Sequence, residues 1–116
     1  MKRMLIVILG LLMCKNVFAA DYYRGRTIIG VGVYSTGSNS ILLIDVDGDK
    51  SGLPACAATK RFAISSTAPH YKEVMSLAMT AYAKQDNTVD IRVLNSCGYF
   101  VNAADILGIK TGVMPF

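Results

Sequence analysis

Most of the chain is built from short stretches in which hydrophobic and polar positions alternate. These stretches are rich in β-branched and aromatic residues, and turn residues separate them, a pattern typical of β-strands. The predicted strands are residues 27–34, 40–46, 60–65, 89–93 and 105–110. Turn residues at 35–39 join the first two, which we therefore expect to form a hairpin.

One segment follows a helical period instead. Its apolar positions recur at spacings of three and four residues: Tyr71, Val74, Met75, Ala78 and Tyr82. A narrow polar stripe lies on the opposite side: Lys72, Ser76 and Thr80. Little of the remaining circumference is fully polar, which indicates either a helix shared with another subunit or a well-covered helix in a monomer.

The predicted order is three strands, one helix and two strands. A small five-stranded barrel with its helix between strands 3 and 4 is the OB-fold arrangement. The alternative is a ferredoxin-like fold, which needs a second helix. Residues 99–106 are the only other candidate, and Asp105 and Gly108 weaken it. The pattern therefore favours a mainly β OB-fold barrel with one helix.

The first nineteen residues have the features of an export signal. Lys2-Arg3 precedes the apolar residues 4–13, and Val17-Phe18-Ala19 places small residues at the two positions that a signal peptidase reads. The apolar run is too short for a transmembrane helix. We expect a Sec signal peptide at residues 1–19, cleaved after Ala19 or, as the competing position, Ala20, and secretion of the mature protein.

Charge and cysteine content narrow the functions of the remaining domain, residues 20–116. The formal net charge is +4, but three basic residues belong to the predicted signal peptide, so the domain is nearly neutral. It lacks the broad basic surface that nucleic-acid binding requires. The domain keeps Cys56 and Cys97, which are expected to form a disulfide in an oxidising compartment. That bond closes a loop of about 40 residues, worth about 4 kcal/mol.

Catalytic and metal-binding groups are scarce. His70 is the only histidine and Glu73 the only glutamate. With both cysteines oxidised, no nucleophile–base set can be assembled, so we expect no enzymatic activity. Residues 47–52 begin like an EF-hand loop, but Ala58 stands where the bidentate glutamate is required. We interpret the segment as a solvated turn and expect no metal and no cofactor.

Two tyrosines beside two arginines open the domain: Tyr22, Tyr23, Arg24 and Arg26. Aromatic faces next to guanidinium groups are suited to hold a sugar ring and its acidic substituent, because arginine offers a planar pair of donors. These four residues are therefore candidate glycan-binding residues. The alternative is that the tyrosines pack over the end of the barrel and the arginines are solvated.

Three segments together resemble the delivery (B) subunits of AB5 toxins, such as those of subtilase cytotoxin and typhoid toxin. The segments are Ala55-Cys56-Ala57, residues 71–92 and residues 102–109. The similarity covers most of the predicted domain, and the order and spacing of the segments carry it. It implies an OB-fold subunit in a homopentameric ring, which binds sialylated host glycans on its outer surface. It also implies a central pore lined by the helices, where Lys72, Ser76 and Thr80 would face the tail of an enzymatic A subunit.

The sugar site implied by the resemblance matches this sequence in part. Tyr22-Tyr23 matches the family's tyrosines, but Arg24 stands where a serine meets the sialic acid carboxylate, and a one-residue gap would place Gly25 there. Arg24 or Arg26 would then bind the carboxylate. The family often has four cysteines, whereas this domain has two. The alternative function is a periplasmic or secreted OB-fold binding protein that has an unknown partner and no toxin role.

Overall fold

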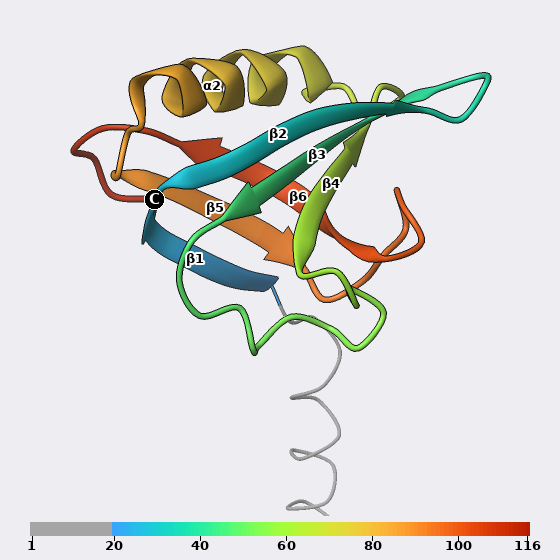
Figure 1. The fold of residues 1–116 in the computed structure, drawn as a ribbon, viewed down its shortest axis with the longest axis horizontal. Helices are drawn as coiled ribbons and strands as arrows, with labels where there is room; N and C mark the ends of the chain where they lie inside the picture. Colours follow the sequence, from blue (N-terminus) through green and yellow to red (C-terminus); the bar gives the residue numbers. More distant parts are fainter. Residues whose placement is uncertain (1–19) are drawn as a thin grey trace, which may run out of the picture.

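The computed structural model describes residues 20–116, and the predicted signal peptide, residues 1–19, lies outside the described residues. In chain order the elements are β1 (Ala20–Arg26), β2 (Ile28–Ser35), β3 (Ser40–Val46), β4 (Arg61–Ser65), α2 (Tyr71–Lys84), β5 (Val89–Leu94) and β6 (Ala103–Lys110). Figure 1 shows α2 lying across one side of the curved sheet. No helix within residues 20–116 has the length and apolar character needed to cross a membrane.

The six strands form one sheet in the order β1-β5-β6-β4-β3-β2. Neighbouring strands are antiparallel except β4 and β6, which are parallel. The two outer strands of this order, β1 and β2, follow each other directly in the chain, with Thr27 alone between them. The ladder is therefore not closed by hydrogen bonds between β1 and β2. The chain itself joins the two edges by bending at Thr27.

The predicted fold class, mainly β with one helix and OB-fold-like, is confirmed for the described residues, but the strand count is six and not five. The additional strand is β1, whose Asp, Arg and Gly residues have low strand propensity and concealed it. Pairing with β5 stabilises β1 in spite of this composition.

Gly25 allows β1 to change direction just before the bend. Its φ of 62° lies in the left-handed region that favours glycine, and the register between β1 and β5 shifts between Tyr23 and Arg26. The Gly25 N–H donates to Asp90 Oδ1 at 2.9 Å, and Asp90 also pairs with Lys110 at 3.3 Å. Asp90 is 8% exposed. The alternation of apolar and polar residues at 89–93 would place Asp90 on a solvated face, but these contacts bury it.

The core fills the space between the sheet and α2. Its largest fully buried side chains come from five of the strands: Ile28, Leu42, Ile44, Phe62, Ile64, Ile91 and Ile106. The helix adds Val74, Ala78 and Ala81. Tyr82, predicted on the buried face, is 42% exposed, and Ala81 is buried in its place. A small residue at 81 lets the end of the helix lie close to the sheet.

The predicted disulfide is confirmed. Cys56 and Cys97 are bonded, with their Cα atoms 6.2 Å apart. The bond ties the long connection between β3 and β4 to the turn between β5 and β6, two segments that share no strand pairing.

Removing this disulfide is expected to destabilise the domain strongly. The bond closes a long loop and so restricts the unfolded chain, and a native disulfide in a small exported domain is worth about 2–5 kcal/mol. The Cys56→Ser/Cys97→Ser double variant should lose a stability in this range in urea unfolding followed by circular dichroism. The reduced wild-type domain should unfold at the same urea concentration as the double variant. Equal stability of the oxidised and reduced domains would contradict the prediction.

Candidate functional site

The four candidate glycan-binding residues do not lie on one surface. Successive side chains of a strand point to opposite faces. Tyr22 and Arg24 are exposed on the outer face of β1, whereas Tyr23 points into the core. Arg26, beyond the bulge at Gly25, turns toward the connection after β3.

Tyr23 is a core residue. It is 6% exposed, and its ring centroid lies 5.2 Å from that of Phe62. Burial, together with the nearby Asp21 carboxylate, raises the pKa of the Tyr23 phenol above its ordinary value. The alternative interpretation of the sequence, that a tyrosine packs over the end of the barrel, describes Tyr23 and not Tyr22.

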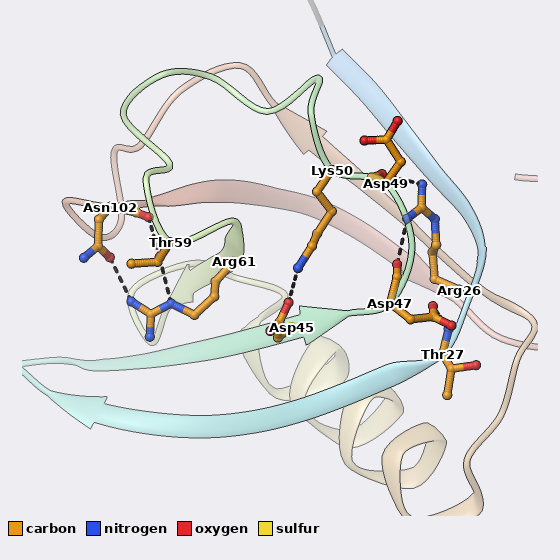
Figure 2. Close-up of polar contacts among 9 residues, drawn as sticks. All are labelled: Arg26, Thr27, Asp45, Asp47, Asp49, Lys50, Thr59, Arg61 and Asn102. Carbon is orange, nitrogen blue, oxygen red and sulfur yellow. Dashed lines mark hydrogen bonds and ion pairs between the residues drawn. The ribbon is translucent and has the colours of Figure 1, made fainter.

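Arg26 holds the loop that resembles the start of an EF-hand. Its guanidinium donates to the backbone carbonyls of Asp47 at 2.7 Å and Asp49 at 2.8 Å, as Figure 2 shows. A Cβ atom at Gly48 would collide with this guanidinium. The Ser51 N–H donates to Asp49 Oδ1 and holds the pKa of that carboxyl below its ordinary value. The loop therefore encloses an arginine side chain of the same molecule.

The described residues, 20–116, show no group of three or more histidine, cysteine, aspartate or glutamate side chains arranged to hold a metal ion.

Tyr22 lies close to two guanidinium groups on the outer face. It is 42% exposed, with Arg24 Cζ 4.5 Å and Arg92 Cζ 5.6 Å from its ring centroid. Arg24 also donates to the Phe116 backbone oxygen at 3.0 Å. Guanidinium groups at these distances are attracted to the electron-rich face of the ring. The result is an exposed aromatic ring with two positive charges beside it.

Strand pairing extends this surface across the sheet. Tyr22 of β1 pairs with Arg92 of β5, which pairs in turn with Gly108 of β6. The ring of Phe116 lies over Gly108, where a Cβ would come within 3.0 Å of the Phe116 Cζ. The same ring meets Tyr22 edge-on, with the centroids 6.2 Å apart. The absence of a side chain at Gly108 thus makes room for the end of the chain.

A cleft of about 460 Å³ opens beside this row, between the sheet and the start of α2. Its aromatic and basic side is formed by Tyr22, Phe116 and Arg92. Its apolar lining consists of Val74, Leu77, Leu107 and Ile109. The helix contributes Glu73, and His70 lies at the N-cap position. The His70 Nε2 atom is buried and has no hydrogen-bond partner.

Of the residues that line the cleft, the sequence indicated Tyr22 as a candidate, whereas Arg24, the other exposed candidate, does not line it. Nothing in the sequence brings Arg92 next to Tyr22 when β1 is not recognised. Glu73 stood out only as the single glutamate of the chain. Phe116 lies beyond the last predicted element, and its only signal was a large apolar residue after a turn-rich segment.

The polar stripe of the predicted helix is exposed on α2. Lys72, Ser76 and Thr80 all face away from the core, and the Thr80 hydroxyl donates to the Ser76 carbonyl at 2.8 Å. Lys72 and Ser76 border a second, open hollow of about 420 Å³ together with Glu73 and Leu77. The stripe is thus a continuous exposed surface, separate from the row through Tyr22.

The fold was compared with known proteins. It is similar to that of Salmonella typhi PltB, solved as a homopentamer of a mutant with Neu5Ac-α2-3-Gal-β1-4-GlcNAc glycans. The similarity has a TM-score of 0.60 and 21% sequence identity, and covers 79% of this chain and 84% of that chain. The resemblance to AB5 delivery subunits is confirmed in the fold. Comparison with protein-family models and with curated protein sequences finds no match.

The two tyrosines should respond differently to substitution. Tyr23→Ala removes a buried ring and should cost about 3–5 kcal/mol of unfolding free energy. Tyr22→Ala removes an exposed ring and should cost less than about 1.5 kcal/mol. Urea unfolding of the two variants under oxidising conditions measures both values. Equal losses would show that the two rings are not on opposite faces of β1.

Proposed function

We propose that this protein is a non-enzymatic delivery subunit of an AB5-type toxin that binds sialylated host glycans. The observation that carries the proposal is the exposed Tyr22 ring with the Arg24 and Arg92 guanidinium groups close to it, at the edge of an apolar cleft. The ring offers an apolar face to a sugar, and the guanidinium groups attract a carboxylate. The similarity in fold to a protein solved with sialylated glycans supports this assignment.

The site we propose is smaller than the one expected from the sequence. Tyr22 and Arg24 remain glycan-binding residues. Tyr23 supports the site from within the core, and Arg26 fixes the bend that positions β1. The scarcity of catalytic groups supports a binding role and not an enzymatic one.

Export and assembly complete the proposal. A Sec signal peptide at residues 1–19 would direct the chain through the periplasm for secretion, and the disulfide is typical of a protein that matures in an oxidising compartment. The mature domain would form a homopentameric ring. In that ring the stripe of Lys72, Ser76 and Thr80 would line a pore that receives the tail of an enzymatic A subunit.

The surface of the domain supports assembly. A groove of about 420 Å³ between β2 and α2 is lined by Val31, Val33, Met79 and Tyr82, among others. Three of the hydrophobic side chains that line this groove are exposed: Val33, Met79 and Tyr82. Exposed apolar side chains grouped in this way are typical of an interface between subunits.

Glycan binding is tested with the Arg24→Ala variant. Removing a positive charge that lies over the Tyr22 ring should lower the affinity for a Neu5Ac-terminated trisaccharide by about tenfold. The Lys84→Ala variant, which removes an exposed positive charge at the far end of α2, should bind like the wild type. A glycan array followed by calorimetry provides the measurement. A wild-type domain that binds no glycan would favour the alternative, an OB-fold binding protein with an unknown partner and no toxin role.

Assembly is tested by native mass spectrometry of the oxidised mature domain. We expect a pentamer at micromolar concentration. Met79→Glu places a charge in the apolar groove and should shift the domain toward the monomer, because burying an unpaired charge is costly. Val113→Glu, at a fully exposed position outside the groove, should leave the pentamer intact. A wild-type domain that stays monomeric would rule out assembly without a partner.

A further inference from the structure

Arg92 differs from the other arginines of the described domain in its hydrogen bonding. The other three each donate to a group of the same chain: Arg24 to the Phe116 backbone oxygen, Arg26 to the Asp47 and Asp49 carbonyls, and Arg61 to Thr59 and Asn102. Among residues 20–116, no hydrogen-bond or ion-pair partner is found for Arg92. Its donors therefore remain available beside the cleft.

The cleft holds groups of opposite charge that do not neutralise each other. Arg92 and Glu73 both line it, yet the two ion pairs found in residues 20–116, Lys50–Asp45 and Lys110–Asp90, involve neither of them. The cleft volume of about 460 Å³ lies within the range of small-molecule sites, so a ligand has room between the two charges.

These groups define the chemistry of a complementary ligand. It needs a carboxylate for the Arg92 fork, hydroxyl or amide donors for Glu73, and an apolar face for the rings of Tyr22 and Phe116. An acidic sugar combines all three features, whereas a neutral sugar has no anionic group for a bidentate, charge-assisted contact with the guanidinium.

We infer that Arg92 is the residue that determines the preference of this site for an acidic sugar, by binding the ligand carboxylate across the cleft from Glu73. This inference rests on the proposed glycan-binding function. It assigns Arg24 a different role, because the Phe116 backbone oxygen already engages the Arg24 guanidinium. Arg24 contributes positive charge and holds the Tyr22 ring, and Arg92 supplies the planar pair of donors.

The test combines changes in the protein with changes in the ligand. Wild type, Arg92→Gln and Arg92→Lys are titrated calorimetrically with Neu5Ac-α2-3-Gal-β1-4-GlcNAc, with its carboxylate methyl ester and with Gal-β1-4-GlcNAc, the sialylated glycan being the one solved with PltB. For the wild type, esterification should lower the affinity about 10- to 100-fold. For Arg92→Gln, the acid and the ester should bind equally, at the affinity of wild type for the ester. Arg92→Lys, which keeps the charge but not the fork, should fall between the two.

Controls separate this inference from the proposed function. Lys84→Gln, which removes the same charge far from the cleft, should keep the wild-type ratio between acid and ester, and thermal unfolding should show all variants folded. If wild type binds none of the glycans, the proposed function fails. If wild type prefers the acid to its ester and Arg92→Gln keeps that preference unchanged, glycan binding stands and the role of Arg92 is overturned.

Discussion

The bend at Thr27, held by Arg26, is the constraint on which the rest of the structure depends. The sheet begins with β1 and ends with β2, so the chain must turn sharply between two consecutive strands that share no ladder. The Arg26 guanidinium fixes this turn through two carbonyls of the loop after β3. The Thr27 N–H adds a bond to Asp47 Oδ1 at 2.8 Å, and Asp47 N–H returns one to the Thr27 carbonyl at 3.1 Å. Figure 2 shows the arginine reaching into this loop. Because every one of these bonds crosses between the bend and the loop, they hold the two edges of the sheet near each other in place of hydrogen bonds between β1 and β2.

The bend also determines which side chains can form a site. With β1 held against β5, the strand alternates between the core and the surface, so Tyr23 stabilises the fold and Tyr22 faces solvent. The same pairing places Arg92 next to Tyr22 and Gly108 next to Arg92. The buried pair of Asp90 and Lys110 supports this arrangement from the other side of the bulge, since Asp90 accepts the Gly25 N–H. A register slip of one residue would exchange the roles of the two tyrosines and dismantle the row. The site therefore depends on the bulge as directly as on its own side chains.

The sequence predicted the parts of the fold that follow from local periodicity. Strands β2 to β6 and the helix have strong alternation or helical spacing, and two cysteines allow a single pairing. Strand β1 was missed because its stability comes from pairing with β5 and not from its own composition. The two strands are distant in the sequence: Gly25 and its hydrogen-bond partner Asp90 are 65 residues apart. Tyr82 was assigned to the core because spacing alone does not show where a helix leaves the sheet.

The cleft could not be predicted from the sequence, because, like β1, it depends on pairing between distant segments. Arg92, Gly108 and Phe116 belong to one surface only through long-range register, whereas Tyr22 and Arg24 could be found because they are neighbours in the chain.

The arginines of the domain show how one residue type serves both structure and binding. Arg26 and Arg61 donate hydrogen bonds to backbone and side-chain acceptors and so hold loops in place, as Figure 2 shows. A guanidinium engaged in this way is held in one geometry and has few donors left for a ligand. Arg24 serves both structure and the proposed site. It donates one hydrogen bond to Phe116, and its guanidinium lies over the exposed Tyr22 ring. Proximity to an aromatic ring is therefore a poor guide to function here, since Arg26 also lies 5.4 Å from the Tyr23 ring yet is committed to the loop. Three features together mark a binding arginine in this domain: an exposed aromatic ring beside it, an adjoining cleft, and N–H donors without a partner among residues 20–116. Arg92 combines all three.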